Sequence, residues 1–485
     1  MSIARKAIVS TLWTSGLNYI AMGVGFIFGV LRDRVLMPDE NGIYMFGLAV
    51  VDILFILAAV SFNISVIQAN DEREDLYSTA FVLTIILSVL MLVAVVLVGW
   101  FLHLRGTLVL KIEAFLVLGV FSTLNLFTIL FSSYLEKQLD YKKIARINLM
   151  AVLAFPVVSY LLVSLGWGAW GMVLGYCATF VVSFIGMTIV SRYPVGFTFN
   201  PTTARWFMSM GWKLIFSRGM EVIFVRYGTL VTEAMLGTSL QGSYGRALKY
   251  WEMAPQTVAP AVVTVALPTY AKVQHDRDRL SQAFTLVLFF LVRALMPFVL
   301  VFGVIPEAFI GVLGNQWQDA VPVLRILAVG ALLSPMFENM KQLLYARGKP
   351  EAIVRIRAVQ LVVFIPSMYV FVLWFGISGA ALAIVINYFI GVSGALFVVR
   401  REVSVGWISV LLLPAVFGAI AASVVLMFPL PTLGLGAIAR FVLEALYIVG
   451  IFVVLEFFVE RRRLKEYGVY IRSVMKSTET TSTPT

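Results

Sequence analysis

Cysteine and histidine are almost absent from this chain, which has one cysteine, Cys177, and two histidines in 485 residues. A single cysteine excludes an intrachain disulfide and a multi-thiolate metal site. So few cysteines and histidines also argue against a metal-centre enzyme. The sequence lacks the Gly-x-x-x-x-Gly-Lys-[Ser/Thr] pattern of a phosphate-binding loop, which excludes transport driven by an ATPase within this chain. We expect no cofactor and no metal.

Charge is scarce as well, since 13% of the residues are charged and 60% are hydrophobic. This composition is typical of a polytopic membrane protein. Arg5 and Lys6 precede an apolar run that is too long for a signal peptide, so we expect a retained first span. The longest expected outer loop, 306–319, is short, which disfavours a membrane-embedded glycosyltransferase or O-antigen ligase.

Apolar runs of about 20 residues or more, enough to cross the hydrocarbon layer, predict an all-α protein with fourteen transmembrane helices. We place these spans at 7–31, 41–67, 77–102, 112–135, 144–165, 168–190, 209–236, 242–270, 281–305, 320–345, 353–374, 377–399, 405–429 and 436–459.

The net charge of +11 is mainly a topology signal. Most of the 37 Lys and Arg residues fall in alternate loops and at the two ends of the chain. The positive-inside rule then predicts that both termini are cytoplasmic. The few basic residues at the outer face are Arg32, Arg34, Arg105, Lys111 and Arg440. We therefore expect contacts with membrane lipids and no nucleic-acid partner.

Two halves of the sequence resemble each other. Gly42-x-Tyr44 recurs as Gly242-x-Tyr244, and Asp52 is matched by Glu252, all at an offset of 200 residues. This order predicts a duplicated six-span unit, giving two parallel lobes related by a pseudo-two-fold axis along the membrane normal. The predicted parts are an N-terminal lobe (1–190), a linker with an interfacial segment (191–208), a C-terminal lobe (209–400), an appended helix pair (401–460) and a disordered cytoplasmic tail (461–485).

Ionisable residues concentrate in the expected seventh to ninth spans. Because a charge at bilayer depth is costly, such groups face protein or a water-filled cavity and indicate a pathway. We expect a cationic cavity for an anionic, lipid-linked substrate. Its candidate phosphate ligands are Arg218, Arg226, Arg246, Lys249 and Arg293. The candidate acids, for a coupling ion (H⁺ or Na⁺) or the cavity wall, are Asp52, Glu221 and Glu252. The alternative, that these charges form structural ion pairs between helices, stays open.

Several stretches resemble Wzx-type polysaccharide exporters, closest to the colanic-acid and teichuronic-acid exporter branch. They are the Gly42–Tyr44 segment, the loop 135–144, the segment 265–280 with Ala-Leu-Pro-Thr-Tyr-Ala, and the segment 312–327 with Gly-Asn-Gln-Trp and Pro-Val-Leu. The resemblance spans about residues 1–400 and places the chain in the multidrug/oligosaccharidyl-lipid/polysaccharide exporter superfamily.

This resemblance implies a flippase in the bacterial inner membrane. Such a protein moves a polyprenyl-diphosphate-linked oligosaccharide to the outer leaflet by alternating access, next to polysaccharide polymerase and export machinery. Two rivals share the superfamily: a lipid II flippase and a multidrug or cation antiporter. An antiporter requires a cavity dominated by carboxylates, whereas the seventh to ninth spans are rich in cations. The expected protein is thus a transporter and not an enzyme.

Overall fold

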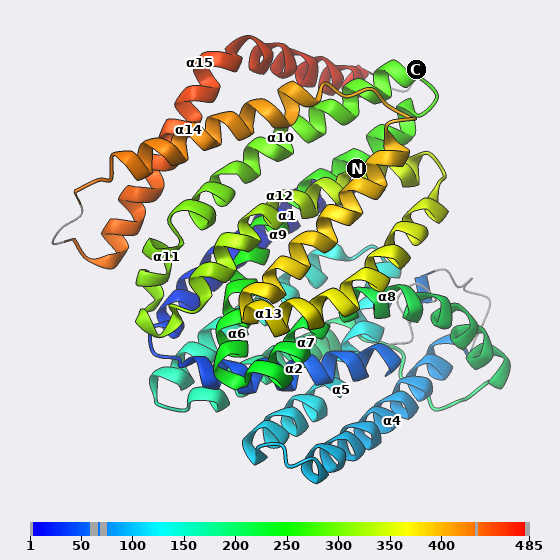
Figure 1. Cartoon of the computed structure of the whole chain (residues 1–485). Helices are drawn as coiled ribbons and strands as arrows, with labels where there is room; N and C mark the ends of the chain where they lie inside the picture. The colour runs from blue at the N-terminus through cyan, green and yellow to red at the C-terminus, as the bar shows by residue number, and fades with distance from the viewer. Residues whose placement is uncertain (1–2, 59–65, 68–74, 432–434, 481–485) are drawn as a thin grey trace. The chain divides into compact units, whose positions relative to one another are not determined.

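The computed structural model of the chain describes residues 3–58, 66–67, 75–431 and 435–480 (Figure 1). Every regular element in these ranges is a helix. Helices form here because lipid offers no partner for backbone N–H and C=O groups, and a helix satisfies them within one segment. The side chains that lie outside the described part are those of residues 3–15, 17–18, 57–58, 210–218, 221, 259–265, 268, 462 and 464–480.

Among the described residues, nine helices are long and apolar enough to cross a membrane. They are α4 (Leu76–Leu104), α5 (Val109–Lys137), α6 (Tyr141–Ser164), α7 (Gly168–Ser191), α10 (Arg277–Val304), α12 (Ala320–Ala346), α13 (Pro350–Val399), the π-helical η2 (Ile408–Leu412) joined to α14 (Leu413–Met427), and α15 (Ala437–Thr480). The other long helices are α1 (Ile3–Asp33), α2 (Pro38–Ala58), α8 (Pro201–Leu236) and α9 (Thr238–Val273). The short ones are α11 (Pro306–Leu313) and the 3₁₀ turn η1 (Asn315–Trp317).

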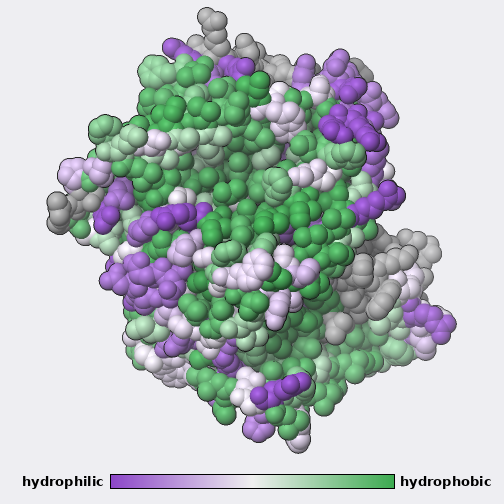
Figure 2. Space-filling view, viewed as in Figure 1, coloured by the Kyte–Doolittle hydropathy of each residue, from purple (hydrophilic) through white to green (hydrophobic). Residues whose placement is uncertain are grey.

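The expected all-α, multi-pass membrane architecture is therefore confirmed, while the number of spans and the two lobes stay predictions. Large apolar side chains such as Leu97 and Trp100 of α4 are exposed, as lipid-facing residues are. Figure 2 shows hydrophobic side chains covering much of the visible face.

One compact unit comprises Met1–Arg246 with Val372–Ile377. Within it α6 packs against α1 and α7, α5 packs against α2, α4 and α7, and α2 packs against α8. Small residues set these approaches. A Cβ added at Gly175 of α7 would lie 2.9 Å from the Ser159 backbone of α6. Close backbone approach at small residues is how helices associate in lipid.

The second compact unit comprises Ala247–Phe371 with Ser378–Thr485. Within it α10 packs against α12, and α14 and α15 pack against α10 and against each other (Figure 1). The predicted lobe boundaries, 1–190 and 209–400, are not tested by this division and stay predictions.

Helix α13 consists of two antiparallel arms. Gly376 has φ 59° and ψ −140°, a backbone conformation outside the helical region that glycine adopts readily. The second arm returns along the first, so that Gln360 Nε2 donates to the Asn387 carbonyl at 2.7 Å. The turn lies between the two spans predicted at 353–374 and 377–399.

The segment between α7 and α8 is extended and anchored to the start of α4. Tyr193 donates its hydroxyl to the Tyr77 carbonyl at 2.7 Å, and the Asn200 backbone N–H donates to Thr79 Oγ1 at 3.1 Å. Asn200 also caps α8 by accepting from the Thr202 N–H. Residues 201–208 of the predicted linker are the first turns of α8, and the interfacial position of this segment stays a prediction.

Helix α15 continues beyond its apolar part. The sequence predicts a disordered tail from residue 461, whereas the backbone is helical to Thr480. Arg463 donates to Glu460 at 3.3 Å, an i, i+3 pair that stabilises the helix where it leaves the apolar run.

Candidate substrate site

An arginine and an aspartate pair within the first unit, at mid-helix positions. Arg226 of α8 donates from Nε to Asp52 Oδ2 of α2 at 2.6 Å, and its Nη2 lies 2.5 Å from the same oxygen. The two side chains remain 20% and 30% exposed. An accessible ion pair in the middle of apolar helices is the arrangement expected beside a hydrated space.

Aromatic side chains surround this pair. Tyr44 of α2 and Tyr176 of α7 lie within electrostatic range of Arg226. Their rings are 5.9 Å apart, and Phe155 of α6 lies between 5.6 and 6.0 Å from both. The cation therefore lies next to a cluster of aromatic rings, of which Tyr44 is buried and Tyr176 and Phe155 are half-buried.

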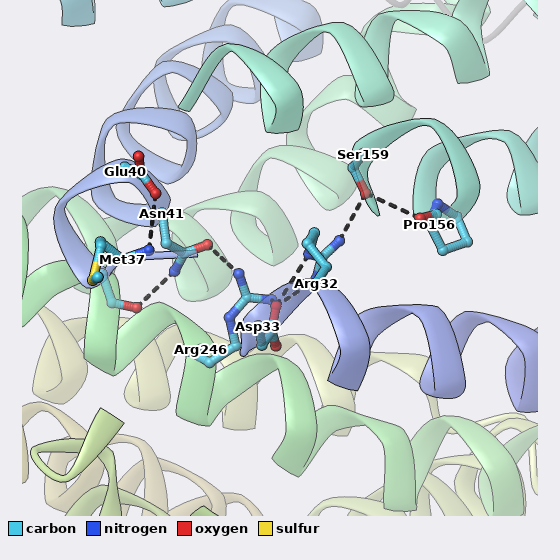
Figure 3. A network of polar contacts seen from close by, with 9 residues as sticks. Arg32, Asp33, Met37, Glu40, Asn41, Pro156, Ser159 and Arg246 are labelled. Carbon is cyan, nitrogen blue, oxygen red and sulfur yellow. Dashed lines mark hydrogen bonds and ion pairs between the residues drawn. The ribbon is translucent and has the colours of Figure 1, made fainter. Parts of the chain in front are cut away.

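Arg246 of α9 lies in a second, closed network (Figure 3). Its Nη1 is 3.2 Å from Asp33 Oδ1, and its Nη2 donates to Asn41 Oδ1 at 2.6 Å. Asp33 also accepts from Arg32 at 3.0 Å, and Arg32 in turn donates to Ser159 Oγ at 3.1 Å. The Arg246 and Asp33 side chains are 2% and 0% exposed, so this network is sealed by protein. We call it the Asp33 network.

The Asp33 network also includes the point where the first turns of α2 and α9 cross. Asn41 Nδ2 donates to the Gly242 carbonyl at 2.7 Å. A Cβ added at Gly242 would overlap the Pro38 carbonyl oxygen, and one added at Gly42 would overlap the Thr238 carbonyl oxygen. The contact is thus reciprocal at an offset of 200 residues: position 42 meets 238, and position 242 meets 38. Both glycines are required here, because any side chain would separate α2 from α9.

Arg293 of α10 lies in the second unit and is held by the appended helices. Its Nε is 3.1 Å from Glu456 and from Glu460 of α15, and its Nη2 donates to the Ser409 carbonyl of the π-helical η2 at 3.1 Å. Its guanidinium also lies 3.3 Å from the centre of the Phe289 ring. These contacts match the alternative interpretation of a structural ion pair between helices.

The remaining candidates lie in different environments. Lys249 is exposed and Glu252 is half-buried, both in the second unit, whereas Arg246 on the same helix is buried in the first. Glu252 is within electrostatic range of Tyr388 of α13. The side chains of Arg218 and Glu221 lie outside the described residues.

Sequence reasoning missed three kinds of residue. Asp33, which lies between the expected outer-face residues Arg32 and Arg34, was not among the candidates, and neither was Asn41, although a polar side chain beside a glycine at a span start is a signal for a close crossing. Glu456 and Glu460 are spaced i, i+4 and so share one helix face, which could have identified them as partners for a buried cation. Glu444 pairs with Arg440 at 2.8 Å on its own helix.

Comparison with known proteins decides the family. A family model described as "Polysaccharide biosynthesis protein" matches residues 33–322, more than half of the chain. The chain belongs to this family. It is 27% identical to the succinoglycan biosynthesis transport protein ExoT of Rhizobium meliloti over 319 residues, 64% of each chain. It is 23% identical to the lipopolysaccharide biosynthesis protein WzxC of Escherichia coli over 415 residues, 83% of this chain and 82% of the relative.

The fold of this chain is similar to that of a transporter of known structure. A structure of the lipid II flippase MurJ in an inward closed conformation superposes with a TM-score of 0.76, at 14% identity, over 93% of this chain and all of MurJ. The predicted membership of a polysaccharide export family is confirmed by this match, and the similarity to MurJ shows the shared fold. The family member is a membrane transport protein and not an enzyme.

Proposed function

We propose that this protein flips a polyprenyl-diphosphate-linked oligosaccharide repeat unit from the cytoplasmic to the outer leaflet of the inner membrane. In this proposal fourteen spans form two parallel six-span lobes and an appended pair, with both termini in the cytoplasm. Membership of the polysaccharide biosynthesis family and similarity to a succinoglycan transport protein support the substrate class. The reciprocal contact of Gly42 and Gly242 supports the duplication.

Arg226 is the proposed ligand of the diphosphate, and its partial exposure carries this proposal. A guanidinium can bind two phosphate oxygens at once through its planar fork. In the present state Arg226 directs Nε and Nη2 to a single carboxylate oxygen of Asp52. The substrate must therefore displace or share with that carboxylate.

Asp52 supplies a way to couple transport to an ion. A proton on Asp52 cancels its charge, which weakens its attraction for Arg226 and leaves the guanidinium available to the diphosphate. Loss of the proton restores the ion pair and releases the phosphate. Proton binding at Asp52 and phosphate binding at Arg226 then favour each other, as reciprocal linkage requires.

The Asp33 network is the proposed closure at the outer end of the pathway. Alternating access requires this end to open, so the bonds of Asn41 to Gly242 and of Arg246 to Asp33 must break in the other state. Contact of Arg246 with the diphosphate is possible only after that opening. Arg293 has no part in this proposal, because its contacts tie α10 to α15.

Depletion of the protein in its own host tests the proposal. Mass spectrometry of the lipid extract should reveal one polyprenyl-diphosphate-linked repeat unit that builds up and disappears when the wild-type chain is restored. Build-up of lipid II instead would support the lipid II flippase. No lipid-linked intermediate, together with greater sensitivity to cationic drugs, would support the antiporter and contradict the proposal.

A further inference from the structure

A groove of about 270 Å³ lies between the two arms of α13 in the second unit. Its lining includes Arg355, Ile356, Val359, Ile390, Gly394 and Phe397. These residues are near the first and last turns of α13, so the groove opens at the end of the helix pair away from Gly376. A Cβ added at Gly394 would lie 3.2 Å from Ile356, so the arms are in close contact where the groove begins.

Three arginines surround this end of the groove. Arg355 forms part of its lining, the Arg400 guanidinium lies 4.3 Å from the centre of the Phe397 ring, and that of Arg401 lies 5.1 Å from the same ring. All three side chains are exposed. Within the described part of the chain, none of them lies within ion-pair distance of a carboxylate.

The neighbouring basic residues, in contrast, do lie within ion-pair distance of carboxylates. Arg347 and Lys349 both pair with Glu402, and Arg357 lies 3.8 Å from Glu338. Glu402 and Glu338 are thus already engaged by other basic residues. Glu351, one turn before Arg355, is exposed and still leaves the three arginines in excess. The groove is left with an excess of positive charge at its mouth and an apolar interior, and an anionic amphiphile complements both.

We propose that this groove binds an anionic phospholipid, with its phosphate on Arg355, Arg400 and Arg401 and one acyl chain between the arms of α13. The predicted topology puts this end at the cytoplasmic leaflet, whose anionic lipids attract basic residues near the surface. Phe397 supports the site because two guanidiniums lie over its ring and the same residue forms part of the groove lining. The inference depends on the predicted orientation and not on the substrate of the transporter.

Native mass spectrometry of the purified full chain tests the site. Phosphatidylglycerol should bind about tenfold more tightly than phosphatidylcholine, because only the former carries net charge. The combined variant Arg355→Gln, Arg400→Gln, Arg401→Gln should remove that preference. Val359→Trp, at an exposed lining position, should weaken binding of both lipids by filling the groove.

Arg105→Gln is the matched control, since Arg105 is an exposed arginine that lies 5.2 Å from the Phe101 ring at the opposite predicted face. It should leave the preference unchanged. Thermal unfolding of each variant checks that it is folded, and Val359→Trp provides a second test if the triple variant is not. Equal binding of the two phospholipids by the wild type would overturn the proposal. Tighter binding of undecaprenyl phosphate than of phosphatidylglycerol, lost in Val359→Trp, would also overturn it.

Discussion

Two arginine–aspartate pairs of the first unit differ in one property, access to solvent. Arg246 and Asp33 are buried; Asp33 also accepts from Arg32, and Arg246 also donates to the Asn41 amide oxygen. Arg226 and Asp52 have one principal partner each and keep 20% and 30% of their surface exposed. A sealed pair contributes to a single closed arrangement of helices, whereas an open pair can exchange its partner for a ligand. On this difference rests our proposal that the first pair serves closure and the second binds the substrate.

The largest effect should follow from removing the shared carboxylate. Asp33→Asn leaves the buried Arg32 and Arg246 without the acid that balances them, and we expect a loss of about 3 kcal/mol in the free energy of unfolding. Thermal unfolding of the purified chain in detergent measures it. Adding Arg246→Gln should recover part of the loss. Wild-type stability of Asp33→Asn would contradict the sealed state of this network.

The free energy of unfolding should be nearly as sensitive to a substitution at Gly242, where α2 crosses α9. Gly242→Ala places a methyl group against the Pro38 backbone, and we expect about 2 kcal/mol of destabilisation from overpacking. Gly245→Ala is the control, because its Cβ would meet side-chain ends and no backbone: Met45 at 3.3 Å and Gln241 at 3.7 Å. The comparison uses the same unfolding measurement. Equal stability of the two variants would show that the crossing is loose.

Replacing Arg226 of the exposed pair should have a small effect on stability and a large effect on export. Arg226→Gln should cost about 1 kcal/mol of stability or less, because water reaches Asp52 in its place. It should nevertheless reduce glycan export at least about tenfold, while Arg226→Lys keeps part of the activity through its charge. Export is measured in cells that contain equal amounts of protein in the membrane. Full export by Arg226→Gln would contradict the proposed role of Arg226 as the phosphate ligand.

The smallest effect is expected for Glu402, a carboxylate outside the predicted spans. Burial raises the pKa of Glu402, but hydrogen bonds from Lys349 and Arg347 outweigh it and hold the pKa below its ordinary value. A lowered folded-state pKa gives stability that is present above the unfolded pKa and is lost as the pH falls through the folded one. Glu402→Gln should thus cost about 1 kcal/mol at pH 7, with the difference from wild type shrinking as the pH falls below the ordinary glutamate pKa and disappearing below the lowered pKa of Glu402. A difference that persists at low pH would assign the effect to packing.

The helices and the turn at Gly376 could be predicted because apolar run length and a glycine between runs act locally. The position of Asp52 and Arg226 within helices could also be predicted, since charge within an apolar run is visible in the sequence. Their pairing could not, nor could the burial of Arg246, whose partner Asn41 lies 205 residues earlier in the chain. The spacing i, i+3, i+6 puts Arg246, Lys249 and Glu252 on one helix face, but spacing does not reveal which part of that face another helix covers.

Competition between Asp52 and a diphosphate for Arg226 is tested most directly by the affinity of the purified protein for undecaprenyl diphosphate. Asp52→Asn should bind this lipid more tightly than the wild type, because the rival carboxylate is gone, and Arg226→Gln should bind it at least about tenfold more weakly. Equal affinity of all three proteins, or weaker binding by Asp52→Asn, would contradict the assignment of Arg226 as the phosphate ligand.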